Sequence, residues 1–113
     1  MKIINLTPHA LTIVYGENNM EKYVIEPSGN VARVAAHTEN IGSNTTDDGF
    51  TIPLTTTVFG EVENLPEPKD GMIYVVSSLV AGRVPDRQDV MIPNQSIRDD
   101  KGRIIGCLSI RKI

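Results

Sequence analysis

The chain has 113 residues, of which 40% are hydrophobic and 22% charged, and its formal net charge is −3. This composition is typical of a soluble globular chain, and the acidic balance argues against a partner that is a nucleic acid polymer. A single cysteine excludes an internal disulfide and a multi-cysteine zinc site.

The first part of the chain predicts short strands separated by turns. Proline and glycine punctuate it at Thr7-Pro8-His9 and Pro27-Ser28-Gly29, where tight reversals are expected. Strands are expected at Lys2–Leu6, Leu11–Tyr15, Lys22–Ile25 and Val31–Ala36.

The middle of the chain changes character twice. His37–Gly49 is polar and rich in Asn, Thr, Asp and Gly, which predicts a long loop or a flexible lid. Phe50–Val62 is β-rich, and Pro53 within it indicates an edge position or a bulge. Asn64–Gly71 contains two prolines and is expected to be a non-helical connector.

The last part begins with the apolar run Met72–Val76, which predicts a buried strand. Ser77-Ser78 interrupts this run, and Leu79–Ala81 can form one short helical turn. Val84–Ile97 is expected to be irregular, with a short strand at Val90–Ile92. A hairpin turn at 98–102 and a final strand at Arg103–Ile110 complete the chain.

These elements predict one all-β domain over residues 1–113: a compact, small sandwich or barrel with at most one or two short helical turns. A sheet this small leaves strand edges open, so a homo-oligomer is expected. No window approaches the roughly 18 apolar residues of a membrane span. The N-terminal segment lacks a secretory pattern, so a cytoplasmic protein without a membrane partner is expected.

Charge is distributed unevenly along the chain. Residues 1–80 hold four basic and ten acidic side chains, whereas residues 81–113 hold seven basic and four acidic ones. A strand that ends in two hydroxyls beside arginines is a plausible anion site, because arginine binds phosphate through charge-assisted hydrogen bonds. The candidate ligand-binding residues are Arg33, Ser77, Ser78, Arg83 and Arg87.

Each of these residues also has a structural interpretation. The serines can cap a helix or satisfy backbone groups, or one can act as a nucleophile. Arg33 lies among small apolar residues and points either into a pocket or out to solvent. The arginines and aspartates of residues 86–100 can form salt bridges that order an irregular segment. No metal site is expected, because neither His9 nor His37 has other potential metal ligands at a recognised spacing. No cofactor is expected either.

Five strings together carry a resemblance: NLTPH, PSGNVARV, LPEPKDG, IYVVSSLVAGRVPDRQDV and RDDKGRIIGC. In these the chain resembles a family of small, uncharacterised proteins encoded in bacterial and phage genomes. The resemblance covers most of the chain outside Glu17–Tyr23 and His37–Val58. It implies no reaction, but a phage-type setting favours proteins that capture a host defence signal or block a host protein.

The sequence therefore predicts a non-enzymatic binding module for an anionic, nucleotide-derived small molecule such as a host defence signal. The alternatives are a protein-binding inhibitor of a host protein, a structural phage component, or a hydrolase that uses His9 or Ser77.

Overall fold

The computed structural model describes all 113 residues and confirms the predicted all-β fold, with one short helix and one 3-10 turn. The elements are β1 (Lys2–Asn5), β2 (Leu11–Tyr15), η1 (Glu17–Asn19), β3 (Glu21–Ile25), β4 (Arg33–Thr45), β5 (Thr51–Glu63), β6 (Met72–Val75), α1 (Ser78–Arg83), β7 (Val90–Arg98) and β8 (Ile104–Arg111). Neither helical segment is long and apolar enough to cross a membrane.

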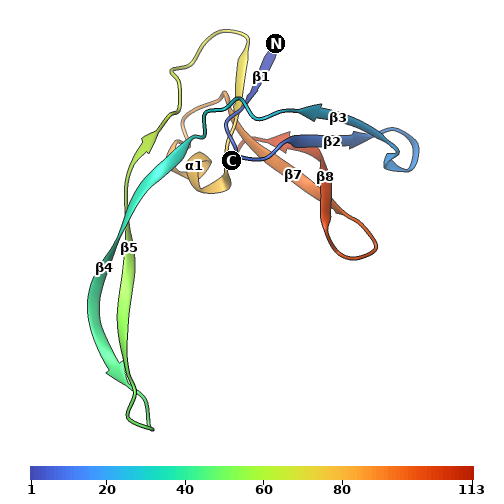
Figure 1. The fold of residues 1–113 in the computed structure, drawn as a ribbon. Coiled ribbons are helices and arrows are strands. Elements are labelled where there is room, and N and C mark those ends of the chain that lie inside the picture. Colours follow the sequence, from blue (N-terminus) through green and yellow to red (C-terminus); the bar gives the residue numbers. More distant parts are fainter.

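Six strands form one mixed sheet in the order β1-β6-β7-β8-β2-β3, while β4 and β5 pair only with each other (Figure 1). β6 runs parallel to both β1 and β7, and β8 is antiparallel to β7 and parallel to β2. The chain after the edge strand β3 returns to the opposite edge of the sheet, where Pro27 forms an isolated bridge with Asn5 of β1. The sheet therefore curls until its two edges nearly meet.

The Asn5 side chain joins these two edges. It is 1% exposed, and its amide nitrogen donates to the carbonyls of His9 (2.8 Å) and Ile25 (3.0 Å). Its amide oxygen accepts from the backbone N–H (3.0 Å) and the hydroxyl (2.7 Å) of Thr7. All four hydrogen bonds of a buried amide are thus satisfied, which is the condition for placing such a group in a core.

Strand β6 lies between two apolar clusters. Tyr74 and Val76 pack in the larger cluster with residues of α1, whereas Val75 points the other way and packs with Leu11 and Cys107. Successive side chains of a strand point to opposite faces, so a strand buried on both faces must be apolar throughout. This explains the uninterrupted run that identified the strand in the sequence.

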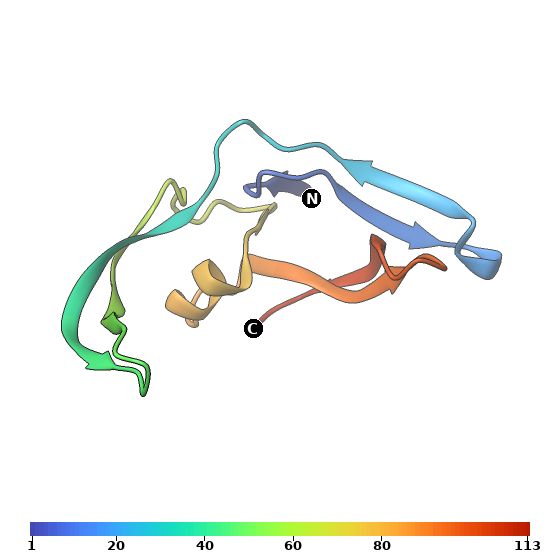
Figure 2. The same ribbon diagram turned by 60° about the horizontal axis from the view of Figure 1, so that its bottom comes forward.

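The paired strands β4 and β5, called the arm below (Arg33–Glu63), project from the body on the side of α1 (Figures 1 and 2). The prediction of a long loop over His37–Gly49 is wrong: β4 continues to Thr45, and only residues 46–50 form the turn. The polar side chains are compatible with a strand because both faces of the arm meet solvent. Two bulges, one beside Gly42 (φ 132°), interrupt the pairing.

Two further predictions concern the segment that contains β7 and the position of Pro53. The segment expected to be irregular contains a longer strand than predicted, because β7 runs from Val90 to Arg98 through Pro93. Its pairing with β8 supplies the order that local sequence did not indicate. Pro53 lies in the two-stranded arm, where every strand is an edge, as its position in the sequence predicted.

Candidate functional site

A cavity of about 260 Å³ lies between the loop after β1, the segment that begins β4, and the first turn of α1. Its wall is almost entirely apolar, and three polar residues are among those that line it. The lining residues are Leu6, Thr7, Pro8, Val31, Ala32, Arg33, Val34, Ser77, Leu79 and Val80. The fold thus places two of the predicted ligand-binding residues, Arg33 and Ser77, in one cavity, although they come from different elements.

Ser77 owes its position to the junction of β6 with α1. Its backbone is extended (φ −69°, ψ 159°), and its hydroxyl oxygen accepts from the backbone N–H of Val80 at 3.4 Å. Helix capping, one of the alternatives for the serine pair, is therefore confirmed for Ser77. Capping uses the oxygen as an acceptor and leaves the hydroxyl proton available as a donor. Ser78 is the first residue of α1, is exposed, and does not line the cavity.

Arg33 begins β4 and pairs across the arm with Glu63 of β5, with a distance of 3.1 Å between Nε and Oε1. The two side chains are 69% and 48% exposed. An ion pair with this much solvent contact contributes little to stability, because water screens it. Glu63 therefore holds the Arg33 guanidinium only weakly.

Arg83 lies on α1 one turn beyond Leu79, which lines the cavity. Its guanidinium carbon lies 5.2 Å from the centre of the Phe59 ring on β5, within the range of a cation–π contact. Side chains four residues apart share one face of a helix. Arg83 therefore lies on the same face of α1 as Leu79 and contacts Phe59 of the arm.

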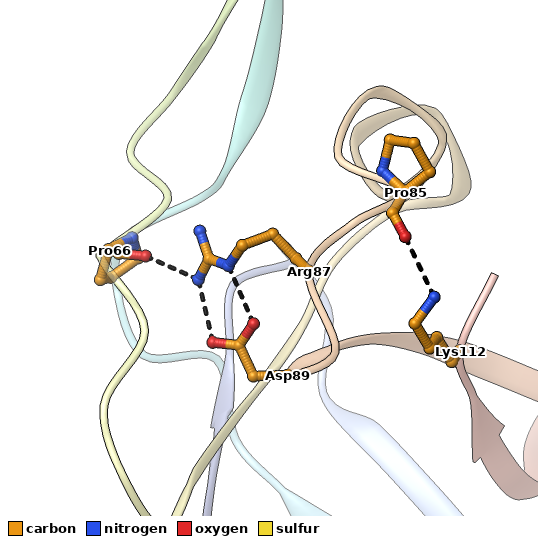
Figure 3. A network of polar contacts seen from close by, with 5 residues as sticks. All are labelled: Pro66, Pro85, Arg87, Asp89 and Lys112. Carbon is orange, nitrogen blue, oxygen red and sulfur yellow. Dashed lines mark hydrogen bonds and ion pairs between the residues drawn. The ribbon is translucent and has the colours of Figure 1, made fainter.

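Arg87 belongs to a separate network, shown in Figure 3. Its Nε and one terminal nitrogen donate to the two carboxylate oxygens of Asp89 at 2.8 and 2.9 Å, and the same terminal nitrogen donates to the carbonyl of Pro66. The side chains of Arg87 and Asp89 are 20% and 16% exposed. The hydrogen bond from Arg87 lowers the pKa of Asp89, and the same bond raises the pKa of Arg87.

This network ties the connector before β6 to the loop before β7. It matches the salt-bridge alternative for the arginines and aspartates of residues 86–100. Asp99 of the same stretch forms its ion pair with Arg103, which lies outside that stretch, at 2.9 Å. The pKa of Asp99 is lowered chiefly by the hydrogen bond from the backbone N–H of Arg103, and the hydrogen bond from the Arg103 side chain lowers it further. A role of Arg87 in ligand binding stays a prediction, and it requires the guanidinium to leave Asp89.

The two histidines lie apart from any arrangement of metal ligands. His37 contacts Glu39 at 3.0 Å on the exposed arm, and His9 lies in the turn after β1. No group of three or more His, Cys, Asp or Glu side chains is placed to hold a metal ion. Cys107 is buried beside Leu11 and Val75, as expected for a small apolar residue in a strand.

Sequence reasoning missed three residues that shape this region: Asn5, Thr7 and Phe59. Asn5 and Thr7 belong to the NLTPH string, whose turn signal indicated only a reversal of the chain. Phe59 stood in an expected strand, but nothing in its neighbourhood indicated that Arg83 would lie above it.

No family model, curated protein or solved structure matches the chain. The candidate site therefore rests on its own geometry.

Proposed function

We propose that the protein is a non-enzymatic binding module that captures an anionic, nucleotide-derived small molecule in the cavity between α1 and the start of β4. The observation that carries this proposal is the meeting of Arg33 and Ser77 in one largely apolar cavity, with Arg83 stacked on Phe59 beside it. Ligand sites commonly combine an apolar wall with a few convergent polar groups.

The chemistry of the site suits a molecule with both a ring and a charge. The cavity is slightly smaller than the roughly 300–1,000 Å³ of sites that enclose a whole drug-sized ligand. It holds one part of a nucleotide, such as the base, against Leu6, Val31 and Leu79. A phosphate at the rim then meets the Arg33 guanidinium, which can bind two of its oxygens at once.

Isothermal titration calorimetry with AMP, ADP and a cyclic dinucleotide tests this proposal. Arg33→Ala should weaken the binding of at least one probe about tenfold or more, since a charge-assisted contact contributes about 1.5–3 kcal/mol. Arg103→Ala is the matched control, because Arg103 is also exposed (72%) and ion-paired but lies on the β7–β8 turn. The absence of binding by every probe, or equal losses in both variants, would refute the proposal.

A second candidate function is a protein-binding inhibitor or a structural phage component. The observation that favours it is the arm, which exposes large apolar side chains to solvent. Its phage-type setting rests on the resemblance of the sequence strings alone. A stable complex with one host protein, unaffected by Arg33→Ala and lost when the arm is altered, would favour this candidate over the first.

A further inference from the structure

The arm exposes an apolar surface that its own chain does not cover. Ile41, Phe50, Ile52 and Leu54 are 63%, 66%, 42% and 37% exposed. No charged residue occurs between Phe50 and Gly60. A two-stranded hairpin is at best marginally stable alone in water, and an uncharged β-rich edge invites uncontrolled pairing. An exposed apolar surface of this kind is typical of a contact with a partner.

The apolar side chains lie mainly on one face of the arm. Ile52, Leu54 and Val58 alternate along β5 and so share a face, whereas Thr55 and Thr57 point to the other. From β4, His37 and Glu39 lie on the same face as Val58, at its end toward the body. The radius of gyration, 18.7 Å, exceeds the roughly 13 Å of a compact chain of this length. The apolar face is thus held out from the body.

Charge identifies the kind of surface that fits this face. The arm, residues 33–63, holds five acidic side chains and one basic side chain, Arg33, which is a net charge of −4. Residues 98–113, which include β8 and the turn before it, hold five basic and two acidic side chains, a net charge of +3. The body of the protein thus carries, at its C-terminal end, a surface of opposite sign to the arm.

Strand β8 also offers apolar contact area. Ile104 and Leu108 are 59% and 39% exposed, and Arg103 and Arg111 flank them. Both views show the arm and the β7–β8 turn at separate ends of the molecule, so the arm does not lie on β8 of its own chain (Figures 1 and 2). A second copy supplies the same two surfaces free.

We propose that the arm of one chain docks through its Ile52–Leu54–Val58 face onto β8 of a second copy, and that the second arm does the same in return. Such an exchange is a closed two-fold contact in which each chain gives and receives one arm. Opposite charges at the rims fix the register and favour arm-to-β8 contact over arm-to-arm contact, where like charges repel.

The area suffices for a specific dimer of modest affinity. The eight residues of β8 span about 26 Å, and a two-stranded ribbon is about 10 Å wide, so one surface covers about 260 Å². The dimer has two such contacts, and each contact covers one surface on either chain. About 1,000 Å² is therefore buried in total, which is near the lower limit for a specific interface.

Sedimentation velocity of the full chain at micromolar and higher concentrations tests the proposal. The wild type should dimerise, and Leu54→Lys should weaken the dimer about tenfold or more, because lysine is placed against an apolar and basic surface. Thr55→Lys, on the opposite face of the same strand, is the matched control and should leave the dimer intact. On the body, Leu108→Glu should break the dimer, whereas Val24→Glu on β3 should not.

A mixture of the Leu54→Lys and Leu108→Glu chains tests whether the arm of one chain contacts β8 of the other. It retains one intact contact, between the arm of the Leu108→Glu chain and β8 of the other, so association should partly return. A wild type that stays monomeric overturns the proposal. Dimers lost with Leu54→Lys but unchanged with Leu108→Glu show arm-to-arm pairing and overturn it too. Far-ultraviolet circular dichroism checks folding, and Ile52→Lys replaces any Leu54 variant that does not fold.

Discussion

Replacement of Asn5 by alanine tests how the sheet closes. The change removes an amide that is 1% exposed and makes four hydrogen bonds: two to carbonyls and two to Thr7. Without Asn5 the single proton of the Thr7 hydroxyl is free to donate to the carbonyl of His9, 2.9 Å away, but the carbonyl of Ile25 loses its side-chain donor. The two edges of the sheet then lose the side chain that joins them.

The expected cost follows from this inventory. Each hydrogen bond contributes about 0.5–1.5 kcal/mol net, and a buried partner left unpaired costs about 1–3 kcal/mol. We expect Asn5→Ala to lower the free energy of unfolding by about 3–4 kcal/mol. For a domain of this size each kcal/mol lowers Tm by about 4 °C, so Tm should fall by about 12–16 °C.

Urea unfolding followed by circular dichroism measures this difference. Asn40→Ala is the matched control, because the Asn40 amide oxygen accepts one hydrogen bond, from the Gly42 N–H, on the exposed arm. That change should cost less than about 1 kcal/mol. Equal destabilisation by the two variants would refute the reasoning, since it would mean that the Asn5 network does not join the edges.

Three further predictions concern stability. Ser77→Ala should lower the free energy of unfolding by about 1 kcal/mol and Ser78→Ala by less, because only Ser77 caps α1; thermal melts that rank them in reverse would contradict the cap. Gly106→Ala should be strongly destabilising, because the added methyl group would lie 2.9 Å from the Thr12 carbonyl oxygen. At Gly82 on α1 the methyl group meets open space, so Gly82→Ala should raise the free energy of unfolding, measured in urea, by up to about 1 kcal/mol. Arg87 lowers the pKa of Asp89 below the ordinary 3.8, so the pair stabilises the fold fully above that pH and loses its effect as the pH falls through the lowered pKa. The difference in unfolding free energy between wild type and Asp89→Asn should therefore shrink on acidification. A difference that stays constant with pH would contradict a stabilising role of the pair.

The elements that the sequence predicted well are those whose burial is visible locally. β2 was placed with its observed bounds because apolar residues lie between clear turn signals. The run Met72–Val76 indicated a strand buried on both faces, and β6 is one. In both cases the contacts that stabilise the strand select its composition directly.

The arm shows why the remainder was not predictable. The residues of β4 beyond His37 are polar because they meet solvent, and their strand conformation depends on pairing with β5, which lies beyond the turn. Such non-local pairing leaves no periodic pattern in β4 itself. β7 was underestimated for the same reason, since its second half depends on β8.

The sequence indicates individual residues of the candidate site but not how they are arranged in space. The sequence indicates Arg33 and Ser77 separately, and only the fold places them in one cavity. Arg87 was selected by the same reasoning, yet Asp89, two residues away, binds its guanidinium. The sequence does not distinguish an arginine that binds a ligand from one that forms an ion pair within its own chain, because the difference depends on backbone geometry.

The most direct test of ligand capture is mass spectrometry of the small molecules that the protein retains. Wild type and Arg33→Ala are each incubated with a small-molecule extract of phage-infected bacteria, washed, and denatured by heat to release what they bound. We predict that the wild type releases one phosphate-bearing nucleotide derivative, and that Arg33→Ala releases much less of it. Release of no nucleotide by the wild type, or of equal amounts by both proteins, would contradict the proposed function.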